Sequence, residues 1–196
     1  MGVHVTEQGK SKVLAGGLAA GALIAGGAGV GGYAIGGGFD SSSSGCVLPH
    51  ITPLQNVELS DCQLQQFASV SGPVYWVGDQ PNTKVIAYTN AAGTVELSYV
   101  PTNVDASQAS EKQYLTVATY RPINGYYHGI ADLPASQVTT KVLGNGAIIV
   151  VKKSAPLSTF MTFKGATFVV EVFAPKAGES YKFATTNALG PVRASQ

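Results

Sequence analysis

Residues 13–39 form an uninterrupted run of 27 positions without a charged side chain. A transmembrane helix needs about 20 consecutive, mostly apolar residues to cross the roughly 30 Å hydrocarbon core of a bilayer. The run exceeds that length, although eleven glycines between Gly16 and Gly38 dilute its larger apolar side chains. In water, each glycine would destabilise a helix by about 1 kcal/mol relative to alanine, and the segment would be a flexible tail. We therefore predict a transmembrane anchor helix over residues 13–36.

The charges beside this run indicate its orientation. Lys10 and Lys12 precede it, and no further lysine or arginine occurs until Lys84. Because positively charged flanks stay inside, we expect residues 1–12 to be a cytoplasmic N-terminus and the part after the anchor to be extracytoplasmic. The predicted localisation is thus the cell membrane, with a single pass. A cleavable signal peptide is the competing interpretation, although the apolar run is longer than a typical signal core.

Small residues recur at a spacing of four within the predicted anchor. This spacing lets two helix backbones approach closely in lipid and is typical of helix association. Any segment this rich in glycine also produces the pattern by chance, so both interpretations stay open. The positions concerned are Gly17, Gly21, Gly27, Gly31, Gly32 and Gly36.

Residues 37–55 are predicted to be a Gly/Ser linker followed by a disulfide loop. Cys46 and Cys62 are the only cysteines of the chain. Both would lie on the oxidising side of the membrane, which predicts a disulfide between them. The alternative is a metal site that includes His50, but two cysteines and one histidine leave a tetrahedral site one ligand short. We expect no metal and no cofactor.

Residues 56–196 combine helical and strand-like patterns. Apolar residues follow helical spacing over 56–70, with Ser60 as N-cap, and again over 176–189. Turn signals divide the part between them into eight or nine short strands, with one polar stretch that suits a helical turn. The expected hairpins are 85–89 with 95–100, 114–121 with 126–130, 138–143 with 147–153, and 159–163 with 167–173. This order predicts an α+β domain, an antiparallel sheet of hairpins with two flanking helices; a β-sandwich is the alternative.

Two stretches of this region are similar to known sequences. They are Gly72-Pro73-Val74-Tyr75-Trp76-Val77-Gly78, and Val169-Val170-Glu171-Val172-Phe173-Ala174-Pro175 with the later Leu189-Gly190-Pro191-Val192. They resemble segments of uncharacterised membrane-anchored exported proteins of high-GC Gram-positive bacteria. The resemblance implies an extracytoplasmic location and no particular activity.

Charge and motif content argue against several functions. Charged residues make up only 12% of the chain and the net charge is +1, so we expect no nucleic-acid partner. Known hydrolase and metalloprotease motifs are missing from the sequence. No carboxylates pair at close sequence spacing, although distant ones could meet in the folded chain. We therefore expect no enzymatic activity.

One local cluster has the composition of a binding site. Tyrosine rings with amide and guanidinium donors suit the recognition of a sugar or a peptide, and two aromatic residues elsewhere could extend the surface. Alternating tyrosines are also common in strands that bury one face, so this simpler interpretation stays open. The candidates are Tyr75, Trp76, Tyr120, Arg121, Asn124, Tyr126, Tyr127 and His128.

Two functional hypotheses follow. In the first, the chain is a membrane-anchored extracytoplasmic binding or structural module of the cell envelope, which holds a cell-wall polymer or a neighbouring protein. In the second, it is an accessory single-pass subunit of a larger membrane protein complex. The tyrosine cluster favours the first hypothesis, and the small residues of the anchor favour the second.

Overall fold

The computed structural model describes residues 46–109, 113–121, 130, 133–186 and 188–193. The predicted cytoplasmic segment 1–12, the anchor helix 13–36 with its six spaced glycines, and residues 37–45 of the linker lie outside the described residues. Among the residues that are described, no helix is both long and apolar enough to cross a membrane.

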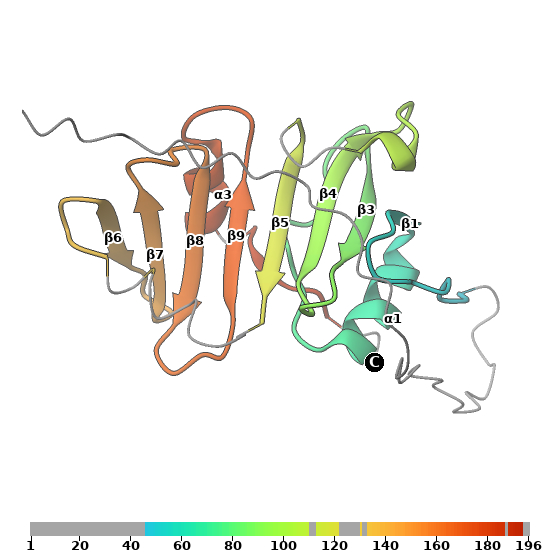
Figure 1. Ribbon diagram of the computed structural model, residues 1–196, viewed down its shortest axis with the longest axis horizontal. Coiled ribbons are helices and arrows are strands. Elements are labelled where there is room, and N and C mark those ends of the chain that lie inside the picture. Colours follow the sequence, from blue (N-terminus) through green and yellow to red (C-terminus); the bar gives the residue numbers. More distant parts are fainter. Residues whose placement is uncertain (1–45, 110–112, 122–129, 131–132, 187, 194–196) are drawn as a thin grey trace, which may run out of the picture. The chain divides into compact units, whose positions relative to one another are not determined.

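A single antiparallel sheet of eight strands dominates the described part (Figure 1). Its order is β1-β3-β4-β5-β9-β8-β7-β6. The strands are β1 (Val57–Leu59), β3 (Thr83–Thr89), β4 (Val95–Pro101), β5 (Leu115–Tyr120), β6 (Val138–Val142), β7 (Ala147–Lys152), β8 (Ser158–Phe163) and β9 (Val169–Phe173). A second sheet pairs β2 (Tyr75–Trp76) with β10 (Gly190–Pro191). With the helices α1 (Asp61–Ser71) and α3 (Glu179–Thr185), the architecture is the α+β fold expected from the sequence, rather than the alternative β-sandwich.

Three of the four predicted hairpins are confirmed by the strand pairing. They join β3 to β4, β6 to β7 and β8 to β9. Each turn carries a glycine with positive φ, such as Gly146 at 82°, which residues with a Cβ adopt only with strain. The predicted hairpin of 114–121 with 126–130 is wrong, because β5 pairs with β4 along one edge and with β9 along the other.

Alternation along the strands gives the large sheet two different faces. The helix face carries the main core, which α1, β2 and α3 help to cover (Figure 1). Its most buried strand residues include Ala87, Leu97, Val117, Ile149 and Val172. The opposite face, called the cleft face below, carries the residues that alternate with the core residues along each strand. They include Glu96, Ala118 and Glu171. A smaller apolar cluster around Val150 and Phe160 covers part of the cleft face.

Helix α1 begins at Asp61, five residues later than the predicted segment 56–70. Ser60 is the N-cap as predicted, and its hydroxyl and the Gln63 side chain form a reciprocal capping box. The residues before Ser60 form strand β1 instead of the first helical turn, because Leu59 is buried against β3. The helix buries Leu64, Phe67 and Ala68.

Helix α3 is shorter than the predicted segment 176–189. It buries Ser180 and Ala184, whereas Tyr181 is 36% exposed. The Ser180 hydroxyl lies 3.0 Å from the Thr159 hydroxyl of β8. This buried polar contact explains how serine replaces an apolar residue at the helix–sheet interface.

Candidate functional site

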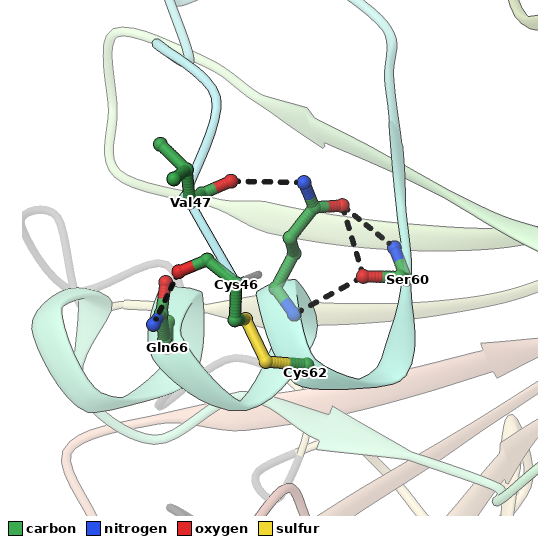
Figure 2. Close-up of a disulfide and its surroundings, with 6 residues drawn as sticks. Cys46, Val47, Ser60, Cys62 and Gln66 are labelled. Carbon is green, nitrogen blue, oxygen red and sulfur yellow. Dashed lines mark hydrogen bonds between the residues drawn. A yellow bond between two sulfur atoms is a disulfide. The ribbon is translucent and has the colours of Figure 1, made fainter. Parts of the chain in front are cut away.

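The predicted disulfide between Cys46 and Cys62 is present (Figure 2), with a Cα–Cα distance of 6.0 Å. Two glutamine side chains of α1 reinforce it. Gln63 Nε2 donates a hydrogen bond to the carbonyl oxygen of Val47, and Gln66 Nε2 donates one to that of Cys46, both at 2.9 Å. The chain segment that enters the domain is thus held to α1 by one covalent bond and two hydrogen bonds.

The disulfide excludes the alternative metal site at His50, because both cysteines are bonded to each other. Within the described ranges, no three histidine, cysteine or acidic side chains lie close enough together to hold a metal ion.

The structure does not assemble the predicted aromatic surface from the residues that it describes. Tyr75 is only 8% exposed, its ring centroid lies 5.3 Å from that of Phe168, and its N–H donates to Thr119 Oγ1 on the helix face. Tyr120 lies on the cleft face, where its hydroxyl donates to Glu171 Oε2 at 2.6 Å. The sheet therefore separates these two tyrosines.

Other members of the predicted cluster lie elsewhere. Trp76 is half-buried on β2, beside Tyr75 and opposite Gly190. Arg121 follows β5, and its Nη2 would lie 3.3 Å from a Cβ atom placed on Gly72, at the end of α1. That nitrogen is buried and has no hydrogen-bond partner among the residues that the structure describes. The remaining four candidates lie outside the described residues: Asn124, Tyr126, Tyr127 and His128.

Sequence reasoning missed a cleft of about 260 Å³ on the cleft face of the sheet. Four neighbouring strands, β4, β5, β9 and β8, supply its walls and floor. Among the predicted residues that the structure describes, Tyr120 alone belongs to it. Its lining residues are Glu96, Thr116, Ala118, Tyr120, Ser158, Glu171 and Phe173.

Strand register brings the two glutamates of the cleft together. Glu96 is paired with Ala118, which is paired on its other side with Glu171. With neighbouring strands about 4.8 Å apart, the two glutamate Cα atoms lie roughly 10 Å from each other. The small side chain between them leaves room above the sheet. Ala118 therefore forms the floor of a cleft with a carboxylate on either side.

A second row of the same face supplies hydroxyl groups and one ring. Thr116 is paired with Phe173, which is paired in turn with Ser158. Thr116 Oγ1 lies 3.1 Å from Ser98 Oγ, so this hydroxyl is already hydrogen-bonded. Ser158 is only 8% exposed, and its side chain lines the cleft. The cleft thus combines hydroxyl groups and an aromatic ring with its two carboxylates.

The electrostatic character of the cleft is acidic. Two carboxylates line it, whereas no lysine, arginine or histidine does so among the described residues. Glu171 forms no ion pair within the described ranges, where salt bridges join Lys84 to Glu58 and Lys176 to Glu179. A half-buried acidic cleft favours ligands that bring positive charge or several hydrogen-bond donors.

One signal in the sequence could have pointed to this site. Glu96 and Glu171 each stand within a strand, between apolar residues that face the core. A charged residue at such a position lies on the opposite face, but which strands are neighbours is not encoded locally. No known protein family, curated protein or solved structure matches the chain. Fold and site together describe a small α+β domain with an acidic cleft on one face of its sheet.

Proposed function

We propose that this chain is a membrane-anchored extracytoplasmic binding module of the cell envelope, and that the acidic cleft is its binding site. The observation that carries this proposal is the cleft itself. It combines carboxylates, hydroxyl groups and an aromatic ring on a rigid sheet, which is the composition of sites that bind small polar groups. Four hydrogen-bonded strands position these side chains, so the site is largely pre-formed.

Three features support the proposed location. The uncharged residues 13–36 have the length of a membrane-spanning helix, and Lys10 and Lys12 mark its cytoplasmic side. The disulfide is typical of a domain that folds in an oxidising compartment. The resemblance to exported, membrane-anchored proteins agrees with both.

The alternative function is that of an accessory subunit in a larger membrane complex. Two large apolar side chains near the anchored end favour it, since Val47 is 78% exposed and Leu54 is 69% exposed. Such side chains are suited to contact with a partner near the membrane surface. Under this alternative, the cleft would have no ligand, and the domain would be recovered with a stoichiometric membrane partner.

A variant that fills the cleft tests the proposed function. In Ala118→Leu the added carbons occupy the space between the two glutamates, so the full-length protein in mild detergent should lose its binding to isolated cell-envelope fragments. Ala92→Leu is the matched control, because Ala92 is exposed in the β3–β4 turn. Thermal unfolding of both variants monitors folding, since overpacking commonly costs about 1–3 kcal/mol.

Two outcomes would contradict the proposal. One is a folded Ala118→Leu variant that binds envelope fragments as tightly as the wild type does. The other is the recovery of a stoichiometric membrane partner in equal amounts with the wild type and with both variants, without binding to envelope fragments; this result would favour the accessory-subunit function.

A further inference from the structure

We propose that strand β6 is an interaction surface at which two copies of this chain pair edge to edge. This inference goes beyond the proposed function, because β6 does not line the cleft and is separated from β8 by β7. Figure 1 shows β6 at one end of the large sheet, and no described strand lies beyond it. Its backbone groups, its side chains and its possible registers together favour a second copy as the partner.

Three residues of β6 direct their backbone N–H and C=O groups away from the sheet. On the β7 side, the Gln137 carbonyl accepts a hydrogen bond of 2.9 Å and the Leu143 N–H donates one of 2.8 Å. Because these groups alternate in direction along a strand, those of Val138, Thr140 and Val142 point to the open edge. They have no hydrogen-bond partner in the described part of the chain. Such an unpaired row is a template for a further strand.

The devices that usually protect an edge strand are weak in β6. The strand has five residues, contains no proline, and pairs with β7 without a bulge. Its one lysine, Lys141, lies on the helix face, with Nζ 6.0 Å from the centroid of the Tyr181 ring of α3. The opposite edge of the sheet is β1, which has only three residues. Strand β6 is therefore the edge better suited to accept another strand.

An exposed valine gives this edge an apolar side. Val142 is 66% exposed, whereas Val138 is buried in the smaller apolar cluster around Val150 and Phe160. The two valines point to the same face, because side chains alternate along a strand and these residues are four apart. A strand that placed an apolar side chain opposite Val142 would extend the cluster past the edge of the sheet.

A second copy of β6 fits this edge in one antiparallel register. With Thr140 opposite Thr140 of the other copy, Val142 of each copy lies opposite Val138 of the other, and the outward backbone groups of all three residues form hydrogen bonds. Lys141 then lies opposite Thr139. A shift of two residues in one direction would place the two Lys141 side chains opposite each other, and like charges in that position destabilise a strand pair. A shift in the other direction would leave Val142 without a strand residue opposite it. Charge and apolar contact thus select the two-fold register about Thr140, which is the geometry of a homodimer.

Cysteine cross-linking of the full-length protein in mild detergent tests this pairing, and it also traps a weak dimer. In Thr140→Cys the two Cα atoms would lie about 5.5 Å apart, which allows a disulfide. Thr139→Cys is the matched control: Thr139 is also exposed, but its Cα atoms would lie roughly 8 Å apart, too far for a disulfide. Because Cys46 and Cys62 are bonded to each other, the introduced cysteine supplies the free thiol. We expect the covalent dimer, measured on non-reducing gels after mild oxidation, to form at least tenfold faster in Thr140→Cys.

Two lysine substitutions in the Thr140→Cys background test the contact at Val142. Val142→Lys replaces the apolar contact by a charge at an exposed position, so cross-linking should slow at least tenfold while thermal unfolding is unchanged. Val47→Lys is the matched control, because it adds the same charge at a valine that is 78% exposed and precedes β1. It should leave the cross-linking rate unchanged.

Equal cross-linking rates in Thr140→Cys and Thr139→Cys would overturn the inference, since dimers held by the predicted anchor, or random collisions, do not favour one of these positions. So would an unchanged rate in Val142→Lys, or equal slowing by Val142→Lys and Val47→Lys. These outcomes leave the proposed function standing, because the cleft is tested separately by Ala118→Leu.

Discussion

Tyr99 shows how a single side chain joins two layers of the domain. Its ring is buried in the main core, and its hydroxyl oxygen accepts a hydrogen bond of 2.9 Å from the Val77 N–H. Burial raises the pKa of the Tyr99 phenol well above its ordinary value, so the side chain stays neutral at physiological pH. This bond connects the segment after β2 with β4 across the core.

Replacing Tyr99 by phenylalanine should destabilise the protein by about 1–3 kcal/mol, because the Val77 N–H would be left buried without a partner. Urea denaturation measures this loss as a change in the free energy of unfolding. Tyr181→Phe is the control, since that ring is partly exposed on α3. Equal free energies for the two variants would mean that the Val77 bond contributes no net stability.

The pKa of the Asp105 carboxyl group is lowered by hydrogen bonds from a neighbouring residue. The Ser107 hydroxyl and the Ser107 N–H donate to its carboxylate at the start of the 3-10 helix η1 (Ala106–Gln108), and both lower the Asp105 pKa. Because the lowered pKa belongs to the folded state, the resulting stability is present above the ordinary carboxyl pKa of about 4. It is lost as the pH falls through the lowered value.

Ser107→Ala should raise the pKa of Asp105 toward its ordinary value, although the backbone N–H will retain part of the shift. An NMR titration of the carboxyl carbon measures the change. Ser69→Ala, on α1, is the control and should leave the Asp105 pKa where it is in the wild type. A carboxyl group that titrates identically in all three proteins would contradict the assigned cause.

At the scale of elements, the disulfide and helix α1 act as one unit. Cys62 lies in the first turn of α1, so the bond fixes the incoming chain at the end of the helix that the capping box stabilises (Figure 2). The two glutamine hydrogen bonds hold the carbonyl groups of Cys46 and Val47 beside this link.

The double variant Cys46→Ser, Cys62→Ser lacks the disulfide. Its free energy of unfolding should be lower by on the order of 3 kcal/mol, since the bond closes a loop of about 15 residues. Gln66→Ala removes only one of the two glutamine hydrogen bonds. It should lower the free energy of unfolding by about 0.5–1.5 kcal/mol, the contribution of one hydrogen bond. Thermal unfolding ranks the variants.

Labelling of the denatured, unreduced wild type should find no free thiol, and two labelled thiols would contradict the disulfide.

At the scale of the molecule, the described residues that follow Cys46 form a main core of their own. It joins α1, β2 and α3 to the large sheet, and every buried side chain in it belongs to residues 59–192. These elements bury the helix face of the central strands. The domain therefore has the features of a unit that folds independently of the predicted anchor.

Residues 46–196 alone should be soluble when they are produced under oxidising conditions, and should unfold cooperatively with a mixed α/β circular dichroism spectrum. Differential scanning calorimetry and circular dichroism measure this behaviour. A truncated chain that is molten or aggregates, while the full-length protein is stable in detergent, would show that the domain depends on its membrane segment or on a partner.

The topology of the full chain is tested by reporters fused after Gln196. Because Lys10 and Lys12 stand before the uncharged run and no basic residue follows until Lys84, the C-terminus should be extracytoplasmic. A periplasmic-type or secreted reporter should be active there, and a reporter that works only in the cytoplasm should be inactive. The reverse pattern would refute the proposed orientation.

The sequence by itself determined the features that depend on a few neighbouring residues. Ser60 and Gln63 define a helix start through their own hydrogen bonds, and Asn145-Gly146 defines a hairpin because glycine tolerates positive φ. The disulfide was predictable because the chain has only two cysteines. The α+β class followed from the alternation of such local signals along the chain.

Only the tertiary structure decided which distant strands became neighbours. The turn signal after Tyr120 favoured a local hairpin, but β5 instead pairs with β9. This pairing leaves β5 hydrogen-bonded along both edges and places Val117 beside Val172 in the main core. That pairing places Glu171 two strands from Glu96 and creates the cleft. No local rule specifies it, since a strand's hydrogen-bonding edges accept any partner whose register buries the same faces.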